Sequence, residues 1–363
     1  MFWIGAIVAL SILIIVHESG HYFVAKWCRM RVDRFSLGFG PALIGWRRKG
    51  TLFQVAPIPF GGFVEIRGMN IAEEVDPDDR YAYPNRPVWQ RFLTIFAGPA
   101  TNYLFAIVLA FVLFSTAGIE TGNVWYSISE VHETHDAHGK LESGDRIVSI
   151  KLAGADEPVP LGTPGYGLIE VVQSSKGEEL EIAVDRGGRA QSFKIRPKLD
   201  TITARDPNTG EERKEQRYLL GITTEAHAER EEVGIGTAVA QSLYYPVRQT
   251  ERIVSELYLI ITGKREGELT GPVGITKYIK NAIETGWINA LWLLMVLNVY
   301  LGLFNLFPLP ALDGGRLAFL VYEMATRRRA NPKIEAPVHM VGIMILMLVL
   351  VVVTFKDCAG LFG

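Results

Sequence analysis

Four long apolar segments constrain the fold of this 363-residue chain more than any other feature. They lie at about residues 2–27, 92–117, 288–308 and 338–355, and each is long enough to cross about 30 Å of hydrocarbon as a helix. Overall, 48% of the residues are hydrophobic and 21% are charged. This balance is too apolar for an ordinary soluble enzyme and too charged for a helix bundle lying wholly within a membrane. We therefore predict a polytopic α-helical membrane protein with four transmembrane helices and an inserted polar domain.

The first apolar segment ends in a polar run, His17-Glu18-Ser19-Gly20-His21. On a helix, two histidines four positions apart share one face, with Cβ atoms about 5–6 Å apart. Both imidazoles can then bind one Zn²⁺ ion, and the Glu beside the first can act as a general base. Polar residues placed by accident on a surface helix are the alternative, but ionisable groups at membrane depth are costly and indicate function.

A catalytic zinc ion needs a third protein ligand and one open position. The best candidate is Asp313, in the run NLFPLPALDGG at residues 305–315. Two prolines break the helix there, and two glycines let the backbone turn closely. Non-helical backbone at membrane depth must face protein or a watery cleft. The alternative is that Asp313 only caps a helix end.

Two of the amides at membrane depth are candidates for a role in the site. Asn102 ends the run AGPATN in the second segment, where Gly98 would permit close helix approach. Its amide could bind a substrate carbonyl or a developing oxyanion, or it could join two helices by hydrogen bonds. Asn305 has the same two interpretations.

The distribution of Lys and Arg predicts the topology. These residues gather after the first segment and between the third and fourth, so the positive-inside rule places both loops in the cytoplasm. The part between segments two and three, and both termini, would face the other side. A net charge of −2 gives no basic footprint for nucleic acid. Cys28 and Cys358 would lie on opposite faces of the membrane and would not pair.

The first loop and the insert carry β signals. At residues 52–68, two apolar runs flank a turn-rich centre, which predicts a β-hairpin that either lies on the surface or dips into the bilayer. The predicted domains are 1–121 (spans one and two with the hairpin), 122–225 (an inserted α+β domain) and 226–363 (an amphipathic helix at 234–263, then spans three and four). The run LESGDRIVSI, at residues 141–150, is similar to the middle of a PDZ module. Such a module could bind a peptide or exclude bulky substrates.

Taken together, three motifs resemble those of the site-2 protease family of intramembrane zinc metalloproteases. They are HESGH in the first span, AGPATN in the second and NLFPLPALDGG in the third, which Asp313 would end. The bacterial branch called regulator of sigma-E protease is the most similar, and it also matches at FSLGFGPAL, GGFVEIRG, RPVWQRF and TGPVGI. The resemblance implies that His17, His21 and Asp313 bind zinc and that Glu18 activates water.

The resemblance also implies how substrate is held and where the enzyme works. The hairpin would present substrate along Gly62, Phe63 and Val64, with Asn102 and Asn305 near the substrate. The substrate would be a single-span protein of the bilayer, such as an anti-sigma factor, cut during regulated intramembrane proteolysis. The enzyme would lie in the bacterial inner membrane with the insert in the periplasm. Family sequences often carry an Asn where this chain has Tyr300.

Two other functions are compatible with parts of the sequence. A non-catalytic membrane scaffold could use the PDZ-like insert to bind partner C-termini, but the intact Glu, His and Asp set argues against it. A membrane-anchored zinc protease could carry its site in a soluble domain, but HESGH lies within an apolar span. Both features favour an intramembrane protease.

Overall fold

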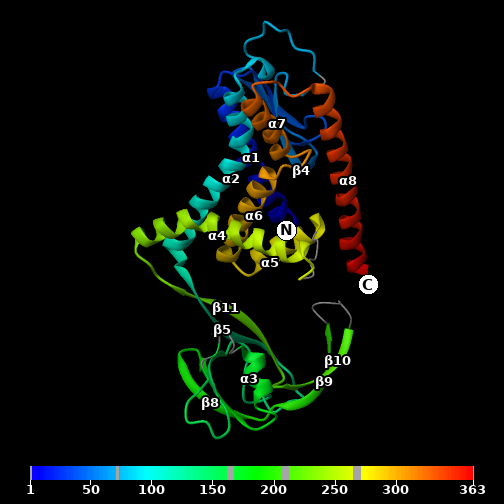
Figure 1. The fold of residues 1–363 in the computed structure, drawn as a ribbon. Coiled ribbons are helices and arrows are strands. Elements are labelled where there is room, and N and C mark those ends of the chain that lie inside the picture. The colour runs from blue at the N-terminus through cyan, green and yellow to red at the C-terminus, as the bar shows by residue number, and fades with distance from the viewer. Residues whose placement is uncertain are drawn as a thin grey trace. The chain divides into compact units, whose positions relative to one another are not determined.

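The computed structural model describes residues 2–70, 73–159, 161, 167–205, 212–264 and 271–362 (Figure 1). Two compact units emerge from its contacts. Unit 1 combines Met1–Ser115 with Gly234–Gly363, and unit 2 is Thr116–Val233. Unit 2 extends beyond the expected insert, residues 122–225, at both ends. The reason is that its first and last strands pair with each other outside those limits.

Helices dominate the described part of unit 1. They are α1 (Phe2–Trp27), α2 (Val88–Ala117), α4 (Ile235–Ile261), α5 (Pro272–Glu284), α6 (Trp287–Leu306), α7 (Asp313–Thr326) and α8 (Pro332–Phe362), with a short 3₁₀ turn, η1 (Tyr83–Asn85). Among the described residues, four helices are long and apolar enough to cross a membrane: α1, α2, α6 and α8. The four predicted spans are thereby confirmed. The amphipathic α4 was expected, whereas α5 and α7 were not, because each is short and follows a Pro- or Gly-rich run.

Helices α1 and α2 approach closely because each has a glycine at the crossing. A Cβ on Gly20 would collide with the backbone oxygen of Ala97. A Cβ on Gly98 would lie 2.5 Å from Cε1 of His21 and 2.9 Å from Cε1 of His17. The expectation that Gly98 permits close approach is confirmed, and what occupies the space is the pair of imidazoles.

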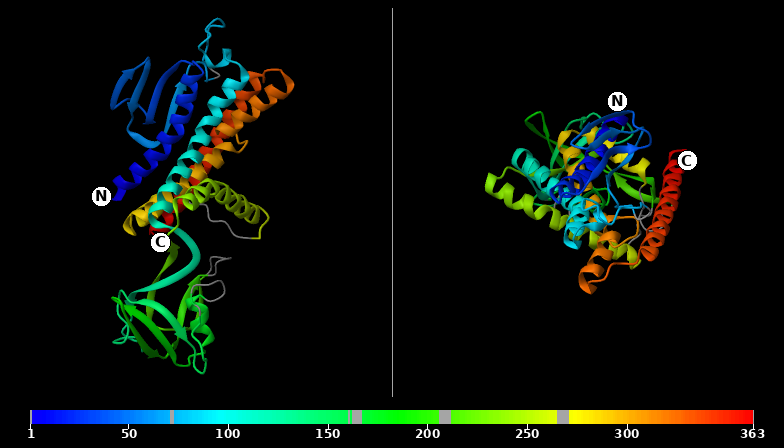
Figure 2. Two further views of the ribbon diagram at one scale, coloured as in Figure 1. Left: turned by 90° about the vertical axis from the view of Figure 1, so that its left-hand side faces the viewer. Right: turned by 90° about the horizontal axis from the view of Figure 1, so that it is seen from above.

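A four-stranded sheet stands beside α1 (Figure 2, left). Its strands are β1 (Val32–Phe39), β2 (Ile44–Arg48), β3 (Thr51–Val55) and β4 (Ile58–Ile66), in the order β2-β3-β1-β4. β4 pairs only with β1, so its other edge is free within the described sheet. A Cβ on Gly62 would lie 2.6 Å from Cγ2 of Ile14 and 3.5 Å from Cγ of Glu18. This places β4 directly against α1.

The hairpin predicted over residues 52–68 is wrong in its pairing. β3 and β4 do not bond to each other, because β1 lies between them, parallel to β3 and antiparallel to β4. Pro57 has a fixed negative φ, and tight two-residue hairpin turns need positive φ. The real hairpin joins β2 to β3 through Lys49 and Gly50, whose φ values are 48° and 83°.

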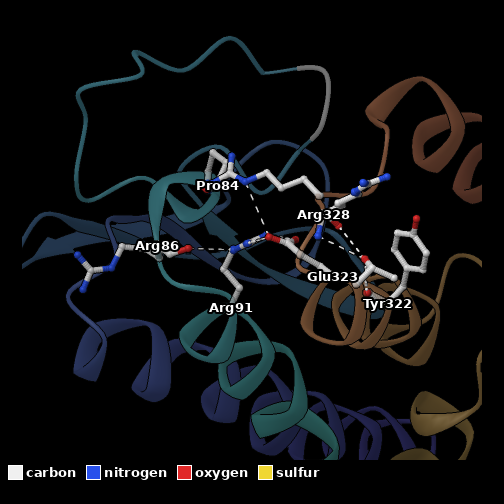
Figure 3. Close-up of polar contacts among 8 residues, drawn as sticks. Pro84, Arg86, Arg91, Tyr322, Glu323 and Arg328 are labelled. Carbon is white, nitrogen blue, oxygen red and sulfur yellow. Dashed lines mark hydrogen bonds and ion pairs between the residues drawn. The ribbon is translucent and has the colours of Figure 1, made fainter.

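A buried ion pair ties α2 to α7 (Figure 3). The guanidinium of Arg91 donates to both carboxylate oxygens of Glu323, at 2.6 and 3.1 Å, and Nε of Arg91 donates to the carbonyl of Arg86. The two side chains are only 9% and 14% exposed. Arg329 donates to the carbonyl of Pro84 at 2.8 Å. These contacts fix α7, and therefore its first residue, Asp313, relative to α2.

Removing Glu323 should destabilise unit 1 strongly. In Glu323→Ala, the guanidinium of Arg91 stays buried without a counter-charge, which costs about 3–5 kcal/mol. The exposed pair of Lys280 and Glu284 gives a control, since Glu284→Ala should cost about 0–1 kcal/mol. Unfolding of both variants in mixed micelles with increasing SDS measures the difference. Equal losses of stability would contradict a structural role for the Arg91–Glu323 pair.

Unit 2 is built on an antiparallel five-stranded sheet in the order β11-β5-β6-β7-β8. The described elements of unit 2 are β5 (Ile119–Val131), β6 (Arg146–Lys151), α3 (Leu168–Ser174), β7 (Leu180–Arg186), β8 (Arg189–Ile195), β9 (Lys198–Arg205), β10 (Glu212–Leu219) and β11 (Ile222–Glu231). The core includes Ile128, Ile150, Ile182 and Ile195, each at most 1% exposed. The run LESGDRIVSI, at residues 141–150, leads into β6. β10 and β11 are separate strands, because Gly221 adopts a φ of 74° between them.

The Gly-Asp turn of unit 2 holds a buried carboxylate. Asp145 is 1% exposed. Arg186 donates to both of its oxygens at 2.7 Å, and the backbone N–H of Glu142 donates at 2.9 Å. Burial raises the pKa of Asp145, but these hydrogen bonds outweigh burial and hold the pKa below its usual value.

The stability of unit 2 should therefore fall in acid. A carboxyl whose pKa is lower in the folded state stabilises the fold above its unfolded pKa of about 3.9, and this contribution is lost as the pH falls through the folded pKa. We expect the hydrogen-exchange protection factors of peptides from residues 116–233 in the full chain to decrease below about pH 4. Asp145→Asn should lack this component and be less protected at neutral pH. Asp156→Asn, which changes an exposed carboxylate, should behave like the unmodified chain; the same acid response in Asp145→Asn would refute this account.

Candidate active site

Three potential metal ligands converge from two helices of unit 1. His17 and His21 are one turn apart on α1 and are 8% and 5% exposed. Asp313 is the first residue of α7, rather than the last of the third span, because Phe307 to Leu312 form an irregular connection after α6. Among the His, Cys, Asp and Glu residues that the structure describes, these three form a cluster whose ligand atoms lie close enough together to hold a metal ion.

The ligand atoms form a nearly equilateral triangle. Nε2 of His17 lies 3.2 Å from Nε2 of His21, and these atoms lie 3.1 and 3.2 Å from Oδ2 of Asp313. Ligands of a tetrahedral zinc ion with bonds of about 2.0–2.1 Å are about 3.3 Å apart. Oδ2 of Asp313 is also buried without a hydrogen-bond partner among the described residues, a costly state that a cation would relieve. Two imidazoles and one carboxylate therefore fit zinc in both donor type and spacing.

The outer nitrogens of both imidazoles contact α2. Nδ1 of His21 donates to the backbone oxygen of Thr94 at 2.8 Å. Nδ1 of His17 lies 3.1 Å from the side-chain amide of Asn102. Thr94 was not identified from the sequence. It lies four residues before Gly98 and eight before Asn102, so its helical spacing from the AGPATN run was the available signal.

Glu18 and the triangle border one cavity of about 560 Å³. Glu18 accepts a hydrogen bond from the backbone of Val64 on β4. Phe63, Val64 and Asn305 line the cavity, and Gly62 packs on α1 beside Glu18.

Asn102 does not line the cavity. It is 0% exposed and lies behind His17, so its placement does not support the expected contact with substrate.

Among the other residues that line the cavity, two lie close to Asp313 or to the connection before it. Arg316 follows Asp313 by one turn of α7. His339 of α8 accepts a hydrogen bond from the backbone N–H of Ala311 at 3.2 Å. This bond helps to fix the connection that leads into Asp313. Neither residue belongs to one of the three motifs, so no motif marked either of them as part of the site.

Comparison with known proteins identifies the class of enzyme. The family model for peptidase family M50 matches residues 5–349. The chain belongs to peptidase family M50. A protein of Fusobacterium nucleatum, named as a candidate zinc metalloprotease, is 30% identical over the full length of both chains. Proteins given the same description from Clostridium acetobutylicum and Rickettsia conorii are 27% and 29% identical, and the alignments cover 97% and 99% of this chain and 96% and 99% of theirs.

Membership of this family confirms three predictions. The protein is a metalloprotease, its metal is zinc, and it is an integral membrane protein with four candidate spans. The site-2 protease resemblance seen in the motifs is confirmed at the level of the family.

Proposed function

We propose that this zinc metalloprotease cleaves peptide bonds within the membrane-spanning segment of single-span membrane proteins, with an anti-sigma factor as the expected kind of substrate. The observation that carries the proposal is the triangle of His17, His21 and Asp313, with sides of 3.1–3.2 Å. It is built on α1, one of the four candidate spans, and on the first residue of α7, which follows the candidate span α6. We assign these three residues as the zinc ligands.

The roles of the surrounding groups follow from their positions. A zinc ion bound there supplies a Lewis acid that polarises the scissile carbonyl and makes water more acidic. Glu18, adjacent to His17 and bordering the same cavity, takes the proton from the attacking water and delivers it to the leaving amine. Burial of the histidines keeps bulk water away from their ring nitrogens, which strengthens their hold on a cation.

Substrate binding is assigned to β4. A transmembrane substrate enters as a helix, whose carbonyls are bonded internally, so the scissile stretch must unwind. The free edge of β4 around Gly62, Phe63 and Val64 lies beside Glu18 and offers backbone partners for an unwound strand. Asn305, which lines the cavity, can bond a substrate carbonyl through its side chain.

Unit 2 is proposed to be a PDZ-like module that restricts access by size. With the Lys- and Arg-rich loops in the cytoplasm, unit 2 lies on the periplasmic side of a bacterial inner membrane. Replacing residues 116–233 by a flexible linker should allow cleavage of substrates whose outer domain has not been trimmed. Loss of all cleavage would indicate recruitment of substrate instead.

Reconstitution tests the proposed activity directly. The purified full-length chain is placed in liposomes with a labelled single-span protein, and the cut site is mapped by mass spectrometry. We expect a zinc-dependent cut inside the apolar span. Cleavage confined to soluble segments, with intact spans, would overturn the assignment.

A further inference from the structure

Three residues on one face of α2 contact the two histidines of α1. Thr94, Gly98 and Asn102 recur every four positions and so share one side of the helix. Gly98 leaves room for the imidazoles, the carbonyl of Thr94 accepts from His21, and Asn102 meets His17. Each histidine thus has its own partner on α2 for the nitrogen that points away from the triangle.

The tautomer of His17 decides which atom of Asn102 must face it. A neutral imidazole that offers a lone pair at Nε2 carries its proton on Nδ1. Nδ1 then needs an acceptor, as Nδ1 of His21 has in the carbonyl of Thr94. The side-chain amide of Asn102 can provide one, because turning it by 180° exchanges oxygen and nitrogen within the same shape.

Hydrogen-bond accounting gives an independent reason for that orientation. As placed, Nδ2 of Asn102 faces Nδ1 of His17 at 3.1 Å, while Oδ1 of Asn102 is buried without a partner among the described residues. After the amide is turned, Oδ1 of Asn102 accepts a hydrogen bond from Nδ1–H of His17. Nε2 of His17 then keeps its lone pair and can bind metal. Metal-binding histidines generally donate their second ring N–H in this way.

We propose that Asn102 is a positioning residue that accepts a hydrogen bond from Nδ1–H of His17, thereby holding the ring in the tautomer and orientation that zinc requires. This inference rests on the proposed zinc site of His17, His21 and Asp313. It gives Asn102 a role different from substrate contact, because Asn102 is fully buried and absent from the cavity wall. It also differs from simple joining of helices, because the bond is made to a metal ligand.

Zinc affinity of three variants tests the proposal in the full-length protein in detergent. Asn102→Leu removes the acceptor, so we expect zinc to bind about 10–100-fold more weakly in competition with a chromophoric chelator. In Asn102→Asp, the carboxylate can accept the hydrogen bond from His17 but cannot donate one. We therefore expect its zinc affinity to be at least equal to that of the unmodified chain. Asn298→Leu is the matched control. Asn298 is also 0% exposed within a span, but it donates to the backbone of Leu294 in its own helix, so its replacement should leave zinc affinity unchanged.

The outcomes separate this inference from the zinc site on which it rests. Unchanged affinity in Asn102→Leu, or affinity in Asn102→Asp as weak as in Asn102→Leu, would overturn the positioning role. Equal weakening in Asn298→Leu would also overturn it, because helix packing alone would then explain the loss. If Asn102→Leu does not fold, Asn102→Asp decides alone, since weaker zinc binding there contradicts the need for an acceptor. Retention of zinc by Asp313→Ala would instead show that the proposed site itself is wrong.

Discussion

Glu18→Gln is expected to abolish proteolysis while zinc and the fold remain. Glutamine has nearly the same shape as glutamate but cannot accept the proton of the attacking water, and loss of a general base typically costs about 10²–10⁴-fold in rate. Glu18 is not part of the ligand triangle, so metal content should be unchanged. Cleavage of a single-span substrate in liposomes and metal analysis of the same preparation measure both effects.

A second acidic residue of the same cavity provides the control. Glu73 lines the cavity, accepts a hydrogen bond from the backbone N–H of Gly68 and pairs with Arg67 at 3.3 Å. Glu73→Gln keeps an acceptor for Gly68 and should retain most of the activity. Near-normal turnover by Glu18→Gln, or an equal loss of activity in Glu73→Gln, would contradict the assignment of Glu18 as the general base.

Asp313→Ala is expected to lose both zinc and activity. The unmodified chain should hold about one zinc ion, bound by three protein ligands. Removing one of the three should weaken binding by more than the roughly 100-fold upper limit seen for loss of an outer partner of a ligand. Dialysis against a moderate chelator followed by elemental analysis should therefore find the variant nearly free of zinc.

Asp357 provides a control, because it is also an aspartate but does not belong to the proposed zinc site. It caps α5 by accepting from the backbone N–H groups of Gly271 and Gly274, at 3.2 and 2.8 Å. Asp357→Ala should retain zinc, even if it loosens the contact between α5 and α8. Normal zinc content in Asp313→Ala would show that another residue completes the site, and the catalytic assignment would have to be rebuilt around it.

The sequence was most informative where a signal is local. The four spans follow from the length of apolar runs, and α4 follows from its amphipathic period. His17 and His21 could be paired in advance because helix geometry fixes residues four apart on one face. The role of Gly98 could also be foreseen, since glycine within an apolar helix favours close packing.

Prediction failed where the pairing is not local. No pattern in residues 52–68 reveals that β1 inserts between β3 and β4, because strand order depends on segments outside the run. The bond of His21 to Thr94 was also missed, because it uses a backbone carbonyl, which every residue carries, so that only the helical spacing of Thr94 from the AGPATN run marked the position. The ion pair of Arg91 and Glu323 joins residues 232 positions apart, and nothing in either neighbourhood marks the other.

The amino-acid sequence alone predicted that this chain spans a membrane and that two histidines with an adjacent glutamate form part of a zinc site, because those predictions depend on runs and spacings within single helices. Only the tertiary structure decided that Asp313 reaches within 3.2 Å of both histidines, that β4 lies beside Glu18, and that Asn102 lies behind His17 rather than in the cavity. These are contacts between distant segments. Their distances are set by how helices and strands pack, which no local pattern of residues encodes.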